Sequence, residues 1–134
     1  MSFTPPYKYI TASELAEKVK QADPQQVQVI DVRDDDFVGG NIVGAKNSPS
    51  NAFYDNVKEL VEENKDKKTM VFHCALSQVR GPKSARIYSE LQKELHPDSK
   101  QEVLVLRGGF TEFAQQYKND PALVEKYNSM YHDQ

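Results

Sequence analysis

One eight-residue segment constrains the fold of this chain more than any other, namely His-Cys-Ala-Leu-Ser-Gln-Val-Arg at positions 73–80. The apolar residues 70–72 (Met-Val-Phe) precede it and are typical of a short buried strand. Gly81 and Pro82 follow it and open a helical pattern, in which the fixed φ of proline suits the first turn. The segment is therefore predicted to be a loop that joins the end of a strand to the start of a helix.

A loop in this position is well suited to bind an anion. Its backbone N–H groups can converge on one point, and the N-terminus of the following helix adds partial positive charge. Arg80 adds a planar fork of donors that fits a tetrahedral oxyanion. The same field stabilises a thiolate, so Cys74 is expected to be a nucleophile at the floor of the loop.

The alternative is that Cys74 is only a small buried residue. It is the only cysteine in 134 residues, lone cysteines are often buried, and short motifs can match by chance. The preceding strand, the adjacent His73 and the Gly81-Pro82 step supply the structural context that such a motif requires. This context favours a functional site over a packing role.

Strand and helix patterns alternate along the rest of the chain. Strands are expected at 7–10, 27–32, 45–48, 69–73 and 102–106. Helices are expected after a capping box at 11–14, after residue 50 or 51, and at 82–95, 110–117 and 120–132. The alternation predicts an α/β fold in which a central parallel sheet carries helices on both faces. We expect a single domain over residues 1–134, with its core at about 7–117 and a helical tail at about 120–132.

Composition narrows the expected partners and compartment. The net charge of -3 gives no sign of nucleic-acid binding, and no apolar stretch approaches the ~20 residues of a membrane span. The N-terminus lacks the basic and apolar regions of a signal peptide, and one cysteine excludes an intramolecular disulfide. We therefore expect a protein of the cytoplasm or nucleus that binds neither membrane nor nucleic acid. No metal or cofactor is predicted.

Polar residues outside the loop could support it, because ligands of such sheets bind beyond the carboxyl ends of the strands. Asp31 and Arg33 lie at the end of an expected strand and could form a charge pair that buttresses the site. His73 is expected to orient the loop by hydrogen bonding. Ser77 is expected either to steady the loop or the thiolate, or to be a plain exposed hydroxyl.

Three stretches of the chain resemble the signature of the rhodanese fold. The first runs from Ile30-Asp31-Val32-Arg33 to Asn47, the second is the Cys74 loop, and the third is Leu106-Arg107-Gly108-Gly109-Phe110. One departure is Asn41, where rhodaneses usually have His. Together the stretches cover roughly residues 7–117. The resemblance implies a single rhodanese-like domain.

Loop length separates the branches of that family. Sulfurtransferase rhodaneses generally have a loop one residue shorter. The H-C-x5-R loop is similar to that of the dual-specificity phosphatases that activate cyclin-dependent kinases, and of their small fungal and plant relatives, some of which are arsenate reductases. His73-Cys74, Ser77, Arg80 and Gly81-Pro82 match that group position by position. The resemblance implies a phosphatase or an arsenate reductase, and disfavours sulfur transfer.

The source of a catalytic proton is left open by the sequence. The cell-cycle phosphatases carry acidic residues within their loop, whereas the loop here has no carboxylate. Asp34, Asp35 and Asp36 are candidate proton donors by chemistry alone. A solvated loop is the simpler interpretation of three adjacent acids, and the leaving group or water could supply the proton instead.

The sequence predicts a cysteine-dependent protein phosphatase, specific for phosphotyrosine or of dual specificity, that acts through a phosphocysteine intermediate on Cys74. The residues expected to bind the substrate are Ala75, Leu76, Ser77, Gln78, Val79 and Arg80. The substrate would be a phosphoprotein or a small oxyanion. The alternative is an arsenate reductase, which would need glutathione or a glutaredoxin because this chain has one cysteine. The intact Cys74 and Arg80 argue against a non-catalytic phosphate-binding module.

Overall fold

The computed structural model describes residues 6–21 and 26–131 of the 134-residue chain. Within these residues, five strands form a sheet in the order β1-β6-β5-β2-β4, and every neighbouring pair is parallel. Their bounds are β1 Lys8–Ile10, β2 Val27–Asp31, β4 Lys46–Asn47, β5 Thr69–His73 and β6 Glu102–Leu106. A second sheet pairs β3 (Asn41–Ile42) with β7 (Val124–Glu125) in antiparallel fashion.

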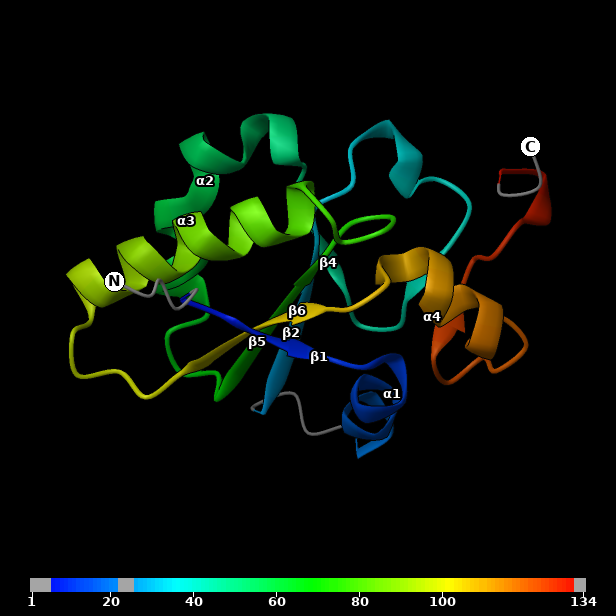
Figure 1. Ribbon diagram of the computed structural model, residues 1–134, viewed down its shortest axis with the longest axis horizontal. Helices are drawn as coiled ribbons and strands as arrows, with labels where there is room; N and C mark the ends of the chain where they lie inside the picture. Colours follow the sequence, from blue (N-terminus) through cyan, green and yellow to red (C-terminus); the bar gives the residue numbers. More distant parts are fainter. Residues whose placement is uncertain (1–5, 22–25, 132–134) are drawn as a thin grey trace, which may run out of the picture.

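The described part of the chain contains four α-helices, α1 Ala12–Gln21, α2 Phe53–Glu63, α3 Arg80–Leu95 and α4 Gly109–Tyr117. Helices α2 and α3 lie on one face of the sheet, and α1 and α4 lie on the other (Figure 1). Short 3-10 turns lie in the connections, η1 Asp35–Phe37, η2 Ser50–Ala52 and η3 Ser129–Tyr131. None of the helices described here is long and apolar enough to cross a membrane. The predicted α/β architecture is confirmed.

A hydrophobic core lies on each face of the sheet, and β5 contributes to both. Val71 packs with Leu15 and Phe113 on the side of α1 and α4. Phe72 packs with Tyr88 on the side of α2 and α3. Successive residues of a strand point to opposite faces, so β5 is held from both sides. The loop that follows β5 therefore starts from a rigid central strand.

The strand order brings two polar segments together at the carboxyl end of the sheet. Strands β2 and β5 are neighbours, and their register pairs Ile30 with Phe72 and Asp31 with His73. Both strands run in the same direction, so the residues after Asp31 and the residues after His73 leave the sheet side by side. The register thus places the residues after β2 beside the start of the loop.

Two helix starts show how the sequence determines local structure. The capping box predicted at 11–14 is present, since the Glu14 N–H donates to Thr11 Oγ1 at 3.2 Å and the Thr11 N–H donates to Glu14 Oε1 at 3.1 Å. Helix α3 begins at Arg80, two residues before the start predicted at Pro82. Arg80 is therefore the first helical residue, and its side chain leaves α3 beside the loop.

The predicted helix over 120–132 is wrong for the part that the structure describes. Val124 pairs with Ile42 as part of β7, and Ser129–Tyr131 forms a single 3-10 turn. Lys126 has φ +59°, a left-handed conformation that an α-helix cannot contain. The apolar spacing that suggested a helix instead serves a two-residue strand pairing and a turn. Residue 132 lies outside the described residues.

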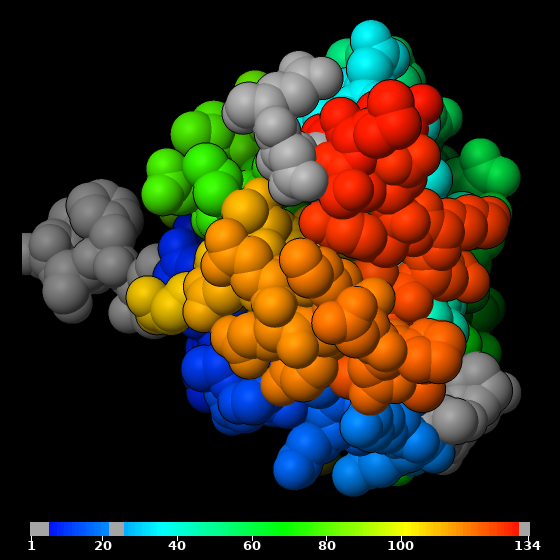
Figure 2. All heavy atoms as spheres, turned by 90° about the vertical axis from the view of Figure 1, so that its right-hand side faces the viewer, coloured from blue at the N-terminus to red at the C-terminus, as the bar shows by residue number. Residues whose placement is uncertain are grey.

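The C-terminal segment packs over α4 and against the connection between β2 and β3. Figure 2 shows the residues after α4 (orange to red) lying beside the segment around residues 34–40 (cyan). The Asn128 N–H donates to the Gly39 carbonyl at 2.9 Å. A Cβ on Gly39 would lie 2.7 Å from Tyr131 Cβ, so glycine permits this close contact. The tail thus covers the outer side of the β2–β3 connection.

Candidate active site

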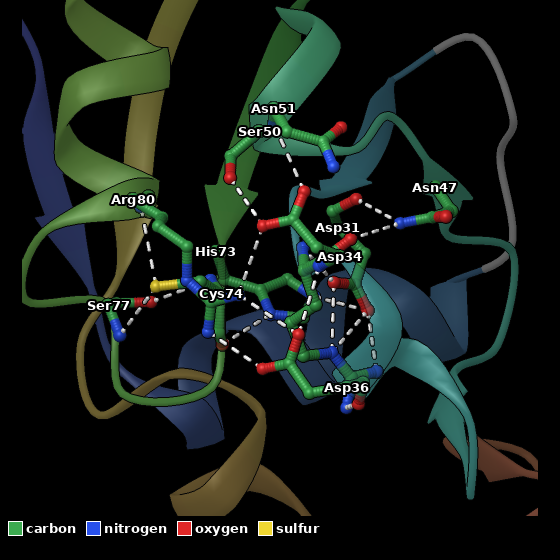
Figure 3. Close-up of polar contacts among 12 residues, drawn as sticks. Asp31, Asp34, Asp36, Asn47, Ser50, Asn51, His73, Cys74, Ser77 and Arg80 are labelled. Atoms are coloured by element: carbon green, nitrogen blue, oxygen red, sulfur yellow. Dashed lines mark hydrogen bonds and ion pairs between the residues drawn. The ribbon is translucent and has the colours of Figure 1, made fainter.

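The segment at positions 74–79 forms the predicted loop between β5 and α3, at the carboxyl end of the sheet (Figures 1 and 3). The connection after β2, which contains Asp34 and Asp36, lies beside it. Figure 3 shows how side chains from these two segments and from η2 point toward one another. The site is therefore assembled from the ends of two neighbouring parallel strands and the starts of two helices.

The sulfur of Cys74 lies at the floor of the loop, next to two backbone donors. The Ser77 N–H is 3.2 Å and the Gly81 N–H is 3.3 Å from Sγ. Cys74 is only 3% exposed. Two N–H groups aimed at one sulfur stabilise a thiolate more than a thiol, because a charged acceptor makes the stronger hydrogen bonds.

Glycine at position 81 allows the first turn of α3 to approach this sulfur. A Cβ built on Gly81 would lie 3.3 Å from His73 Cα and 3.4 Å from the Cys74 nitrogen, which is tight for a side chain. The N-terminus of α3 thus sits directly against the end of β5. This arrangement directs the Gly81 N–H and the positive end of the helix dipole at Sγ.

Ser77 is part of the structure of the loop. It is buried, and its backbone has φ +56°, in the left-handed region. Its Oγ lies 3.4 Å from the Cys74 N–H, as an acceptor. The alternative interpretation of Ser77 as an exposed hydroxyl is therefore wrong, and its contacts with Cys74 match the expectation that it steadies the loop.

A small cavity of about 180 Å³ lies at the mouth of the loop. Its lining consists of the nucleophile candidate and five of the six residues predicted to bind substrate, namely Cys74, Ala75, Leu76, Gln78, Val79 and Arg80. Leu76 and Val79 are exposed, so two apolar side chains lie at the rim of the cavity, beside the exposed Gln78. The sixth predicted residue, Ser77, does not line the cavity, because its side chain turns inward toward Cys74.

Asp31 and Arg33 form the buried ion pair that the sequence predicted, next to the start of the loop. Arg33 Nη2 is 2.7 Å from Asp31 Oδ2, and Nε is 3.0 Å from Oδ1. The guanidinium also donates to the carbonyls of Asp36 and Gly40, and lies 4.2 Å from the centre of the Phe110 ring. Arg33 is 1% exposed, and these contacts tie the connection after β2 to the core.

His73 holds the start of the loop from inside the protein. Its Nδ1 lies 3.0 Å from the Cys74 carbonyl, so the ring can donate there. Nε2 is 3.7 Å from Asp31 Oδ2, too far for a hydrogen bond, and has no other partner among the described residues. Burial lowers the pKa of His73 and outweighs the opposing effect of the Asp31 carboxylate. His73 is therefore neutral at neutral pH.

The start of α4 supports the loop from its other side. The Phe110 N–H donates to the Cys74 carbonyl and the Thr111 N–H donates to the Ala75 carbonyl, both at 2.9 Å. A Cβ on Gly109 would lie 2.4 Å from the Ala75 oxygen, and Gly109 has φ +60°. The sequence had suggested this Gly-Gly-Phe motif only as a fold signature. The structure places it in contact with the loop.

Arg80 makes a two-point contact that the sequence did not predict. Its Nη1 is 2.9 Å from Asp36 Oδ1 and its Nη2 is 2.7 Å from Asp36 Oδ2. Nη1 is also 3.5 Å from Asp34 Oδ2. The hydrogen bond from Arg80 lowers the pKa of Asp36, and the same contact raises the pKa of Arg80. The three-acid run is thus not simply a solvated loop, because two of its carboxylates face Arg80.

Asp34 is itself fixed by the start of the next helical segment. Its Oδ2 accepts from Ser50 Oγ at 2.6 Å, and its Oδ1 accepts from the Asn51 N–H at 3.0 Å. Burial raises the pKa of Asp34, but the hydrogen bonds from Ser50, Asn51 and Arg80 lower it overall. The signal that could have located these acids was their position three to five residues after Asp31, which the sequence already placed near the loop.

Comparison with known proteins gives relatives that include phosphatases and arsenate reductases. The profile of the rhodanese-like domain family matches residues 11–116. The chain is 33% identical over 117 residues to the dual specificity phosphatase ibp1 of Schizosaccharomyces pombe, covering 76% of this chain and 85% of ibp1. It is 38% identical over 104 residues to arsenate reductase 2.2 of Oryza sativa subsp. japonica, covering 76% and 78%. The solved structure of Ygr203w, a yeast protein tyrosine phosphatase of the rhodanese family, superimposes with a TM-score of 0.78 at 27% identity, covering 96% of this chain and 98% of that one.

Proposed function

This chain belongs to the rhodanese-like domain family, and we propose that it is a cysteine-dependent protein phosphatase acting on phosphotyrosine or with dual specificity. One observation carries the proposal, namely that the Cys74 sulfur accepts from two backbone N–H groups at a cavity that Arg80 also lines. Phosphomonoester hydrolysis needs a nucleophile, an oxyanion cradle and water. The loop supplies the first two, and solvent supplies the third.

In the first step, the Cys74 thiolate attacks the phosphorus atom of the bound monoester. A sulfur–phosphorus bond forms, the bond from phosphorus to the leaving oxygen breaks, and the electron pair stays on that oxygen, which takes a proton from solvent. Arg80 and the loop amides bind the three equatorial oxygens of the transferring group, where charge is spread in the transition state.

In the second step, a water molecule attacks the phosphocysteine. The sulfur–phosphorus bond breaks, its electron pair returns to Cys74 as thiolate, and the water loses a proton to solvent as inorganic phosphate forms. The two N–H donors on Sγ favour this step, because they stabilise the thiolate that leaves.

The loop residues favour aryl phosphates as substrates. No loop position between Cys74 and Arg80 carries a carboxylate, so proton donation to the leaving oxygen is weak. A phenolate needs less help to leave than an alkoxide does. The exposed side chains of Leu76 and Val79, at the rim of the cavity, would contact an aromatic ring. We therefore expect phosphotyrosine to turn over faster than phosphoserine.

Arsenate reduction is the second candidate, because a relative 38% identical to this chain is an arsenate reductase. Arsenate and phosphate share shape and charge, so the same loop would bind either one. Reduction of As(V) to As(III) takes two electrons, and two thiols give them up by forming one disulfide. This chain has one cysteine, so glutathione or a glutaredoxin would supply the other thiol and reduce the resulting mixed disulfide. We expect either reaction to occur in the cytoplasm or nucleus.

Parallel assays of the purified protein distinguish the two reactions. One assay uses p-nitrophenyl phosphate, and the other uses arsenate with glutathione and glutaredoxin, each with the wild-type protein and with Cys74→Ser. Cys74-dependent hydrolysis is expected, and thiocyanate formation from thiosulfate and cyanide is expected to be negligible. Negligible hydrolysis alongside robust, Cys74-dependent arsenite formation would reverse the ranking.

A further inference from the structure

Arg80 is held from outside the loop while it lines the loop cavity. Its side chain is 32% exposed, and it is long enough to adopt many conformations from the first residue of α3. Both terminal nitrogens donate to Asp36, at 2.7 and 2.9 Å. The Nε–H makes no hydrogen bond with any described residue. Asp36 thus binds both terminal nitrogens of Arg80, and Arg80 also lines the cavity.

The carboxylate that binds the fork is part of a connected network. Asp36 Oδ1 also accepts from the Asp34 N–H at 2.9 Å. Asp34 in turn accepts from Ser50 Oγ and the Asn51 N–H. In Figure 3 the Arg80 side chain reaches from α3 past Cys74 toward Asp34 and Asp36. The guanidinium of Arg80, at the start of α3, is therefore held by the connection after β2, which is itself fixed by the start of η2.

We infer that Asp36, supported by Asp34, positions the Arg80 side chain for the reaction proposed above. This inference rests on the proposed function. A carboxylate that binds both terminal nitrogens orients the guanidinium plane as well as attracting its charge. An oxyanion in the cavity then meets an arginine that is already ordered. Asp36 contacts Arg80 and not the reacting atoms.

The opposite role would be competition, in which Asp36 occupies Arg80 in place of the substrate. The two roles predict effects of opposite sign. Loss of a competing carboxylate, or loss of its repulsion of an anion, would strengthen anion binding. Loss of a positioning carboxylate weakens anion binding, because Arg80 must then be ordered when the anion binds. The intact network around Asp34 and Asp36 favours positioning.

The test compares Asp36→Asn with Asp35→Asn in the full-length protein, using inorganic phosphate as the probe. Both variants remove one negative charge, but the Asp35 side chain makes no hydrogen bond or ion pair with the described residues. Calorimetry gives the phosphate affinity, and p-nitrophenyl phosphate gives kcat and KM. Asp36→Asn is expected to weaken phosphate binding about tenfold, and Asp35→Asn by less than about twofold. Thermal unfolding confirms that both variants fold.

A second comparison keeps the inference testable if one variant is unstable. Lysine has no planar pair of terminal nitrogens for Asp36 to orient. In the Arg80→Lys background, Asp36→Asn should therefore have no further effect on phosphate affinity, so that the double variant binds phosphate as Arg80→Lys alone does. Asp36→Glu should recover part of the lost affinity. The inference is overturned if Asp36→Asn binds phosphate as tightly as Asp35→Asn, or more tightly. Phosphate affinity does not depend on turnover, so failure of the wild-type protein to hydrolyse esters would refute the proposed function and leave this test intact.

Discussion

At the scale of single residues, the proposed chemistry divides between a sulfur and a guanidinium. Two backbone N–H groups donate hydrogen bonds to Cys74 Sγ. Arg80 lines the same cavity, and Asp36 binds both of its terminal nitrogens. The sulfur is needed for bond formation, and the arginine for both binding and charge stabilisation. Substitutions at the two positions should therefore have different effects.

Cys74→Ser should abolish hydrolysis of p-nitrophenyl phosphate but retain phosphate binding, because serine keeps the cradle and loses the thiolate. Arg80→Ala should lower kcat/KM by about 10²–10³ and weaken phosphate binding as well. Steady-state kinetics and calorimetry measure the two effects. Hydrolysis that survives in Cys74→Ser would show that the sulfur is not the nucleophile.

His73 should make the stability of the protein depend on pH. Burial lowers its pKa in the folded state below the ordinary value of about 6.5. The unfolded chain then binds the proton more readily, so stability from this group is present above about pH 6.5 and is lost as the pH falls toward the lowered pKa. This group should therefore lower the Tm as the pH falls below about 6.5.

The measurement is Tm at pH 7.5 and at pH 5.5 for the wild type, His73→Asn and His96→Asn. Asparagine can donate to the Cys74 carbonyl as His73 Nδ1 does, but it does not titrate. The decrease in Tm should be smaller in His73→Asn than in the wild type. His96 is part-exposed beside Glu62, and its variant controls for the loss of any histidine. Equal decreases in all three proteins would contradict the assignment.

At the scale of elements, the loop is clamped between the starts of α3 and α4. Gly81 lets α3 approach Cys74, and Gly109 lets α4 approach the carbonyls of Cys74 and Ala75. Two glycines thus bring two helices into contact with one loop. Because both contacts involve the backbone of the loop, displacing either helix should move the cradle.

Gly109→Ala should destabilise the protein and reduce its activity, because its Cβ would lie 2.4 Å from the Ala75 oxygen at a backbone φ of +60°. Gly44→Ala is the matched control, since Gly44 has φ +82° but no atom within 4 Å of an added Cβ. The control should lose about 1–2 kcal/mol from backbone strain alone, and Gly109→Ala about 2–4 kcal/mol. Urea unfolding measures both. A Gly109→Ala protein as stable and active as the control would show that the α4 contact is not needed.

At the scale of the whole molecule, the alternation of strands and helices predicts the parallel sheet, and the residues around Cys74 predict a loop between a strand and a helix. Two features could not be predicted from the sequence, because they depend on the tertiary structure. The pairing of Asp36 with Arg80 depends on β2 and β5 being neighbours, and in the sequence three adjacent acids resemble a solvated loop. The C-terminal segment has helical spacing, but it pairs with β3, a strand too short to be recognised by pattern.

Anion binding at the loop should stabilise the entire domain, because the cradle joins β5, α3 and the connection after β2. A ligand that binds only the folded state at 100 times its Kd adds about 2.7 kcal/mol. Inorganic phosphate should therefore raise the Tm of the wild-type protein by several degrees relative to chloride at equal ionic strength. The Arg80→Ala protein should show little change. An equal increase in both proteins would mean that phosphate binds elsewhere or acts only through the solvent.

The proposed mechanism requires the Cys74 sulfur to carry the phosphoryl group during turnover. The most direct test mixes the protein rapidly with p-nitrophenyl phosphate, quenches in acid, and locates any added phosphoryl group by mass spectrometry of the intact protein and its peptides. A phosphoryl group is expected on the peptide that contains Cys74, formed as fast as nitrophenol is released and absent from Cys74→Ser. Steady hydrolysis with no phosphorylated Cys74 at any quench time, or with the phosphoryl group on another residue, would contradict this mechanism.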